Sequence, residues 1–224
     1  MWQKIIPVLS KKHRVITIDL LGHGGTESID RVHTMEEQAK MVKFVLDSLH
    51  LVKYSIVGHS LGGYIALAFA ELFPKNIDKM VLMNSTALPD TTEKQKNRDR
   101  AITMVNKNKN LFIKMAIPNL FTKESNKKHQ KEIQFIKEEA LQTTTQGVIL
   151  SLEGMKIRKD RTAILQDNSI KKLFIIGKKD PLLNYASLIK QTKNSNVKIV
   201  EFSNGHMSHI ENSDALLMQL SLFL

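Results

Sequence analysis

The sequence predicts an α/β protein in which a mostly parallel β-sheet is flanked by helices on both faces and carries a helical cap insertion. Short runs of β-branched and apolar residues alternate with longer segments of helical periodicity, which is typical of βαβ units. The alternation stops between residues 89 and 165 and then resumes. We therefore expect residues 1–88 and 166–224 to form the sheet core, and residues 89–165 to form a cap over the carboxyl ends of the strands.

The first half of the chain begins with the β-branched run RVITIDL and a glycine-rich turn, GHGG, directly after it. A capping box formed by Thr34 and Glu37 then predicts the start of a helix. The elements expected here are, in order, the strand Arg14–Leu20, a helix beginning after Thr34, the strand Tyr54–Val57, the Ala-rich helix Leu61–Phe73, and the strand Met80–Met83.

The middle of the chain is polar and rich in lysine, with helical periodicity and no convincing strand. Residues 89–165 hold 16 Lys and Arg against 9 Asp and Glu, so most of the net charge of +11 belongs to this segment. The strand and helix pattern after it predicts the strand Leu173–Ile176, a helix near Leu182–Thr192, the strand Val197–Val200 and a terminal helix, Ile210–Leu224.

Composition narrows the class of protein. The 224 residues are 42% hydrophobic and 25% charged, and no apolar run approaches the ~18 residues of a membrane span. The absence of cysteine excludes disulfides and a thiol nucleophile and is compatible with the cytoplasm, where we expect the protein to work. The lysines are scattered and aromatic residues make up only 6%, so we expect neither a nucleic-acid partner nor membrane insertion, and no oligomeric state is predicted.

The turn Gly58-His59-Ser60-Leu61-Gly62 carries the strongest chemical pattern. It joins a buried strand directly to a helix, and that context predicts a nucleophile elbow, in which the serine hydroxyl projects above the sheet. The flanking glycines are expected because the strand and helix backbones nearly touch there. Ser60 is therefore the candidate nucleophile, and a serine hydroxyl needs a base and an orienting acid to react at neutral pH.

Asp180 and His206 are the candidate acid and base, because each follows a strand in the second half of the chain. Both side chains should therefore emerge at the same sheet edge as Ser60. His209 is a rival base, although its place at the start of the last helix favours a packing role. Asp160 and Asp167 are rival acids, but they precede the strand that should deliver the acid.

Other histidines and acidic residues give weaker patterns. His23 and His59 lie in turns beside the site, where hydrogen bonding within the loop is the plain interpretation. Asp19 is expected to brace the turn that follows its strand. No His, Asp or Glu grouping has the helical spacing of a metal site, so neither a metal nor another cofactor is expected.

Four segments together resemble the α/β-hydrolase superfamily, specifically its compact bacterial members with a helical cap. These segments are Ile18–Ser28, Val57–Leu67, Gly177–Leu182 and Asn204–Asp214, and they span nearly the whole chain. The resemblance implies the catalytic triad Ser60, Asp180 and His206 and an oxyanion-hole amide from Leu61. Thr26 is a small departure, since the family's first turn often carries serine there.

A larger departure concerns the start of the sequence. Family members of this kind have a strand and a His-Gly-type loop before the segment that matches Met1–Leu20, and that loop supplies the second oxyanion amide. Neither is present in this sequence, so we expect an N-terminally truncated form that lacks a central strand and half of its oxyanion hole. Loss of one such donor typically lowers the rate by about 10²- to 10³-fold.

The resemblance implies hydrolysis of a carboxylic ester or related acyl compound through an acyl-enzyme. The basic cap suggests that this small-molecule substrate carries an anionic group. The same triad also serves carbon–carbon bond hydrolases acting on diketones and a lyase of menaquinone synthesis, and both remain alternatives. A binding protein or inactive remnant on the same scaffold is the alternative from another class, because scaffold does not imply activity.

Overall fold

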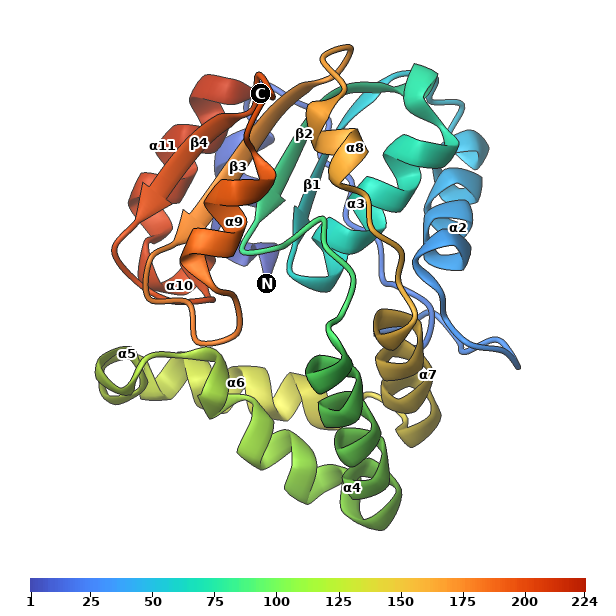
Figure 1. The fold of residues 1–224 in the computed structure, drawn as a ribbon, viewed down its shortest axis with the longest axis vertical. Helices are drawn as coiled ribbons and strands as arrows, with labels where there is room; N and C mark the ends of the chain where they lie inside the picture. Colours follow the sequence, from blue (N-terminus) through green and yellow to red (C-terminus); the bar gives the residue numbers. More distant parts are fainter.

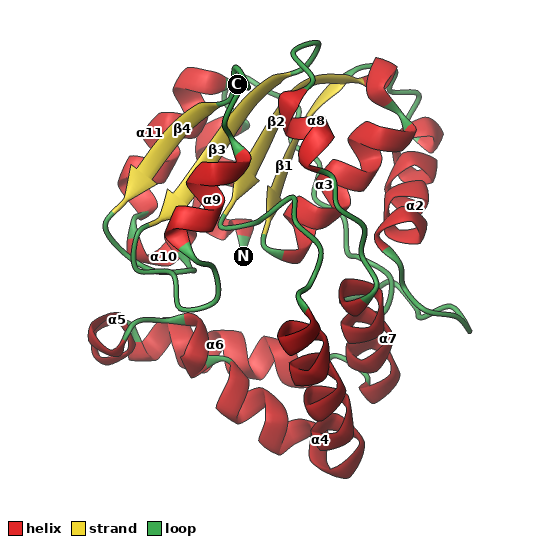
Figure 2. Cartoon of the chain, in the orientation of Figure 1, coloured by secondary structure: helices red, strands yellow, loops and turns green.

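The computed structural model describes all residues from Met1 to Leu224 and is built around one parallel sheet. Figure 2 shows its strands lying side by side with helices on both faces. The strands follow the order β1-β2-β3-β4, and every neighbouring pair is parallel. Their bounds are β1, Tyr54–His59; β2, Ile77–Met83; β3, Lys171–Gly177; and β4, Lys198–Phe202. The predicted parallel sheet is therefore confirmed.

The strands alternate their side chains between two hydrophobic clusters, one on each face of the sheet. On β2, Met80 and Leu82 belong to the larger cluster, while Val81 and Met83 belong to the smaller one. β3 follows the same rule and is buried at every residue but its first. Successive side chains of a strand point to opposite faces of the sheet, so a strand covered on both faces needs apolar side chains at both its odd and its even positions.

Helices from both ends of the chain cover the sheet. The larger cluster includes side chains from α2 (Met35–Ser48), α3 (Leu61–Leu72), α8 (Thr162–Gln166) and α9 (Tyr185–Gln191). The smaller cluster includes Ile5, which precedes α1 (Ile6–Leu9), Leu9 of that helix, and two leucines of α11 (Ser213–Phe223). The short helices η1 (Trp2–Lys4) and η2 (Pro74–Asn76) precede α1 and β2. Both faces of the central strands β2 and β3 are thus shielded from water, while β4 is largely exposed.

Between β2 and β3 the only regular elements are helices, joined by loops, and there is no strand. Its helices are α4 (Thr92–Ala116), η3 (Pro118–Leu120), α5 (Lys123–Lys128), α6 (Gln130–Leu141), α7 (Thr145–Lys156) and then α8. Thr91, Thr122 and Thr144 each cap a helix by accepting a hydrogen bond from the amide three residues later. Figure 1 shows α4 to α7 gathered beyond the carboxyl ends of the strands.

The predicted strand Arg14–Leu20 is wrong, because this segment belongs to no strand. Residues 14–19 take part in no backbone–backbone hydrogen bond, and β1 pairs with β2 alone. The alternating apolar residues still pack, with Ile16 and Ile18 against the larger cluster and Val15 against the smaller one. Apolar alternation alone does not make a strand, since a strand also needs a neighbour for its amides and carbonyls.

The predicted terminal helix Ile210–Leu224 is two helices. α10 covers Ser208–Glu211 and α11 covers Ser213–Phe223, and Asn212 between them has φ −135° and ψ 36°. Glu211 is tied back to the preceding loop, since its Oε2 accepts from the Met207 amide at 2.9 Å and its carbonyl accepts from Asn204 Nδ2 at 3.0 Å. These bonds hold α10 against the loop that carries His206.

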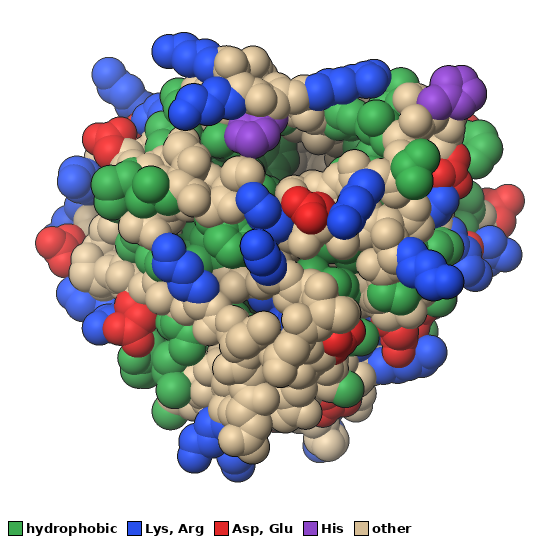
Figure 3. Space-filling model, turned by 90° about the horizontal axis from the view of Figure 1, so that it is seen from above, with side chains coloured by type: hydrophobic (Ala, Val, Ile, Leu, Met, Phe, Trp, Pro, Cys, Tyr) green, Lys and Arg blue, Asp and Glu red, His purple; other side chains and the backbone are tan.

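Charged side chains are spread over the surface. Figure 3 looks at the molecule from above and shows lysine and arginine side chains around the rim, with acidic and hydrophobic ones between them. No helix is both long and apolar enough to span a lipid bilayer.

Candidate active site

Ser60 occupies a strained turn between β1 and α3. Its backbone has φ 51° and ψ −115°, a region that residues other than glycine rarely adopt. The turn is fixed to the sheet, because the Ser60 amide donates to the Met83 carbonyl of β2 at 2.9 Å. Such strain persists only where the surrounding structure imposes it, and it is concentrated at functional sites.

Close backbone approach explains two glycines around this turn. A Cβ atom on Gly58 would lie 2.3 Å from the Gly62 carbonyl oxygen, so the end of β1 meets the first turn of α3 with no room for a side chain. A Cβ atom on Gly63 would lie 2.3 Å from Ser85 Oγ. Gly62 is different, since a Cβ atom there would meet nothing within 4 Å. The expected steric need therefore holds for Gly58 and not for Gly62.

The structure brings Ser60, His206 and Asp180 into one line of hydrogen bonds. His206 Nε2 lies 2.9 Å from Ser60 Oγ, and His206 Nδ1 lies 2.8 Å from Asp180 Oδ2. Both partners are shielded, with side-chain exposures of 3% for His206 and 0% for Asp180. A carboxylate on Nδ1 keeps that nitrogen protonated, which leaves Nε2 as the acceptor for the serine proton.

Asp180 is held by its own loop as well as by the histidine. Its Oδ1 accepts from the Leu182 and Leu183 amides at 2.9 and 3.1 Å. The loop follows β3, while His206 follows β4, so both residues come from strand ends as the sequence predicts. Oδ2 therefore remains directed at the imidazole.

Leu61 is the first residue of α3, directly after Ser60. An amide at this position has no carbonyl one turn earlier in its own helix, and it lies at the positive end of the helix dipole. An oxyanion formed next to Ser60 Oγ is the kind of group that such an amide stabilises.

The rival acids and bases have other roles in the structure. His209 is buried, and burial lowers its pKa to about 3. Asp160 Oδ1 accepts from the amide and hydroxyl of Thr162, and Asp167 accepts from Ser169 in the same way. Both carboxylates lie in exposed turns.

Of the two histidines in turns beside the site, His23 makes a local contact and His59 a long-range one. His23 Nδ1 bonds to the nearby Leu21 carbonyl at 3.0 Å, as a loop histidine would. His59 Nε2 instead donates to the His206 carbonyl at 2.8 Å, across the site. Burial, followed by the neighbouring His206 and His209, holds the pKa of His59 well below its usual range, so this ring stays neutral.

Asp19 braces its turn, as expected. Its Oδ2 accepts from the Gly25 amide at 3.0 Å, and its carbonyl accepts from the Thr26 hydroxyl at 2.8 Å. Gly24, with φ 53°, is required there, since a Cβ atom would collide with the Asp19 carboxylate. Thr26 thus makes the contact that a serine hydroxyl would make.

Two polar residues at the end of β2 belong to the site and were not predicted from the sequence. Asn84 Nδ2 donates to Asp180 Oδ2 at 3.2 Å, and Ser85 Oγ donates to the Ser60 carbonyl at 2.9 Å. The available signal was their position, since both directly follow a predicted strand of the same sheet.

A parallel sheet with a serine on a strained strand–helix turn, and an acid and a histidine from later strand ends, defines a class of α/β proteins with a nucleophile elbow. The family model described as "alpha/beta hydrolase fold" matches residues 1–213. The chain belongs to this family, whose members are generally hydrolytic enzymes.

Individual relatives agree with this assignment. The chain is 35% identical over 88 residues to a 2-hydroxy-6-oxo-2,4-heptadienoate hydrolase of Pseudomonas putida, a match that covers 39% of this chain and 32% of the relative. An esterase from Thermogutta terrifontis superimposes with a TM-score of 0.90 at 27% identity, over 99% of this chain and 83% of that one. An enol-lactonase from Burkholderia xenovorans shares the fold with a TM-score of 0.90 at 23% identity, over 99% of this chain and 85% of that one.

Proposed function

We propose that this protein is a serine hydrolase that cleaves a carboxylic ester or a related acyl compound through an acyl-enzyme at Ser60. The observation that carries the proposal is the hydrogen-bonded relay from Ser60 Oγ through His206 to the buried Asp180. A serine hydroxyl becomes a useful nucleophile when a base is in hydrogen-bond contact with it and a third group orients that base.

The relay supports a two-step reaction. His206 Nε2 takes the Ser60 proton as Oγ attacks the substrate carbonyl, and it then gives the proton to the departing alkoxide, which leaves as an alcohol. Water enters next, loses its proton to His206 and attacks the acyl carbonyl. The Ser60 oxygen recovers that proton as the carboxylic acid leaves. Asp180 stays ionised throughout and stabilises the imidazolium.

The Leu61 amide would stabilise the oxyanion in both steps. Its position after Ser60 places a donor where negative charge develops, and one such donor is worth about 10²- to 10³-fold in rate. The helix α3 behind it adds a favourable dipole.

We assign residues 1–88 and 166–224 to the hydrolase core and 89–165 to a cap that shapes the substrate site. This division is supported by the wholly helical segment between β2 and β3, which lies at the strand ends that carry the relay. A substrate would bind between cap and core, as ligands of open α/β sheets bind at that edge.

The cap also suggests that the substrate carries an anionic group. Arg98, Arg158 and Lys156 are paired with carboxylates, but Lys94 Nζ donates only to the Leu182 carbonyl, at 3.3 Å, in the loop of Asp180. Burial lowers the pKa of Lys94, and an anionic partner there would favour its charged form. The relative from P. putida is a hydrolase named for an acid anion, 2-hydroxy-6-oxo-2,4-heptadienoate.

Covalent labelling tests the proposal. A fluorophosphonate probe should modify wild-type protein at Ser60 and leave Ser60→Ala unmodified, and an Asp180→Asn variant should label far more slowly, because the imidazole loses its orienting carboxylate. Peptide mapping by mass spectrometry locates the adduct. A folded wild-type protein that does not label would overturn the enzyme assignment and favour a binding protein on this scaffold.

Carbon–carbon bond hydrolysis is the second candidate. The same relative is named as the hydrolase of a 6-oxo-dienoate, a compound with a ketone and no ester bond. Parallel assays with ester, thioester and diketone substrates separate the two candidates. Turnover of the diketone, with the esters untouched, would favour carbon–carbon bond cleavage.

A further inference from the structure

Asn84 is the first residue after β2, and its side chain is fully buried between the loops of the relay. Its Nδ2 donates to the Gly205 carbonyl at 2.9 Å and to Asp180 Oδ2 at 3.2 Å, and its Oδ1 accepts from Ser208 Oγ at 2.6 Å. Since a carbonyl and a carboxylate can only accept, the amide nitrogen must face them. The orientation of this amide is therefore fixed by its partners.

The backbone of Asn84 is held as firmly as its side chain. Its amide donates to the Ile175 carbonyl of β3 at 2.9 Å, and its φ of 44° lies in the left-handed region, which asparagine tolerates better than most residues. The next residue, Ser85, donates to the Ser60 carbonyl. The end of β2 thus contacts the serine turn, the aspartate loop and the histidine loop.

We propose that Asn84 is the positioning residue of the relay, setting the orientation of the Asp180 carboxylate and the place of the turn that carries His206. This inference rests on the proposed serine-hydrolase function. One amide proton goes to the same carboxylate oxygen that receives His206 Nδ1, and the other goes to the residue directly before His206. A single side chain therefore fixes both ends of the Asp180–His206 hydrogen bond.

The Asn84 amide also offsets part of the negative charge that the Asp180 carboxylate presents to the His206 imidazole. Hydrogen bonds to an ionised carboxylate are stronger than neutral ones and reduce its pull on a neighbouring proton. Without this donor, Asp180 should favour the protonated imidazole more, and the acidic limb of the pH profile should move to higher pH. The other ionisable groups around His206 are His59, His209 and Glu211, and Asn84→Gly, described below, leaves all three in place and adds no new one.

Two variants separate positioning from plain packing. Asn84→Gly removes the amide while keeping a residue that adopts positive φ without strain. Asn84→Asp keeps the shape but replaces the donor by an acceptor. Thr86→Val is the matched control, since Thr86 Oγ1 makes a buried hydrogen bond to Gln191, 2.9 Å long, that does not reach the relay.

The experiment measures fluorophosphonate labelling of Ser60 from pH 5 to pH 9, together with the proton NMR resonance of the His206 Nδ1–H group. Asn84→Gly should slow labelling by about 10- to 100-fold, as expected for a lost hydrogen bond to a charged group, and shift the acidic limb upward. The NMR resonance should move in both Asn84 variants and stay in place in Thr86→Val. If Asn84→Gly does not fold, the same measurements on Asn84→Asp provide the test.

The outcomes are distinct. Labelling, pH profile and NMR resonance that match wild type in the Asn84 variants, even with lower thermal stability, would overturn the positioning role. A wild-type protein that shows the NMR resonance but never labels would instead overturn the proposed function.

Discussion

His209 is a buried histidine that is kept neutral by its surroundings. It is 6% exposed in α10, and burial lowers its pKa to about 3, against 6.5 in an unfolded chain. Between these values the unfolded chain binds a proton that the folded protein does not. The stability contributed by the neutral ring is therefore complete above pH 6.5 and is lost as the pH falls toward 3.

Replacing His209 by glutamine should flatten this acid dependence. Urea midpoints measured at pH 7.5 and pH 5.0 should differ clearly in wild type and by less in His209→Gln, where His59, whose pKa is also lowered by burial, keeps part of the difference. His13→Gln serves as the control, because His13 is exposed and should leave the wild-type difference unchanged. If His209→Gln loses as much stability between pH 7.5 and pH 5.0 as wild type does, then a group other than His209 causes the acid dependence.

At the residue scale, the sequence was sufficient to bring together Ser60, Asp180 and His206, because Ser60 directly follows β1 and the other two lie in the loops after β3 and β4 of one parallel sheet. Their catalytic roles stay predictions. The sequence places Asn84 directly after a strand but could not reveal the partners of its side chain, which lie 96 to 124 positions away. Asparagine after a strand is usually a turn residue, so only the packed loops show what its amide contacts.

At the scale of elements, a buried ion pair joins the two ends of the cap. Asp90, where the chain leaves the sheet, accepts from Arg158 at 2.6 Å and from Arg98 at 2.9 Å, and its side chain is completely buried. Arg158 also lies 4.2 Å from the ring centre of Tyr64 in α3. The two ends of the cap are thus joined to each other by charge, and Arg158 contacts the core through the Tyr64 ring.

Asp90→Asn should destabilise the protein by about 3–5 kcal/mol, since it leaves a buried guanidinium without its counter-charge. Urea unfolding gives the free energy, and limited proteolysis within residues 89–165 reports loosening of the cap. Asp47→Asn breaks an exposed pair with Lys43 and should cost about 0.5 kcal/mol or less. Equal effects of the two changes would refute a fastening role for Asp90.

Helices and buried strands were well predicted at this scale, because caps and apolar periodicity are local signals. The prediction of a strand over Arg14–Leu20 was wrong because strand pairing is not a local property. The run is apolar and alternating, yet no neighbouring strand pairs with its amides. The helix break at Asn212 was not predicted, for a similar reason. Glu211 forms hydrogen bonds with Met207 and Asn204, and the chain does not continue as one helix.

At the scale of the whole molecule, most of the net positive charge belongs to residues 89–165, the proposed cap. An anionic ester should therefore have a KM that rises with ionic strength, while a neutral ester of the same shape should not. Steady-state assays at low and high salt measure this difference. Equal salt effects on both esters would remove the anionic-substrate hypothesis.

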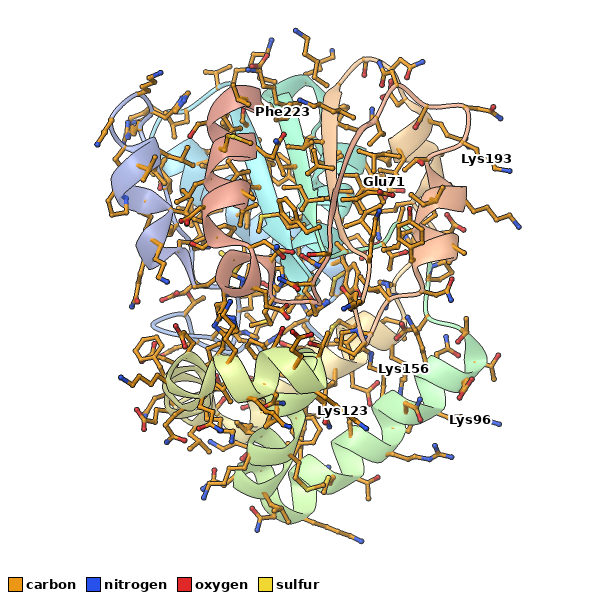
Figure 4. All side chains as sticks on the ribbon, turned by 90° about the vertical axis from the view of Figure 1, so that its left-hand side faces the viewer. Glu71, Lys96, Lys123, Lys156, Lys193 and Phe223 are labelled. Atoms are coloured by element: carbon orange, nitrogen blue, oxygen red, sulfur yellow. The ribbon has the colours of Figure 1, made fainter.

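Lys94→Met sharpens the same prediction, because Lys94 lies against the Asp180 loop. Its KM for the anionic ester should rise, and its salt dependence should shrink. Lys96→Met is the matched control: Lys96 is exposed on α4, and Figure 4 shows it pointing outward. An identical response in both variants would place the anion elsewhere.

The cap leaves the sheet after β2 and returns at β3, which are hydrogen-bonded neighbours. Because these strands are parallel, the chain leaves at one edge of the sheet and β3 begins at the other, so the return runs along α8. The two ends of the cap nevertheless lie side by side, since Asp90 is paired with Arg158. The number of residues between them has little effect on the sheet, because the entropic cost of closing a loop grows only with the logarithm of its length. The helices between Asp90 and Arg158 can accordingly be exchanged as one module, with the strand register and the serine turn left in place. The proposed cap can thus change its sequence, and with it the proposed substrate site, while the relay residues stay where β1, β3 and β4 place them.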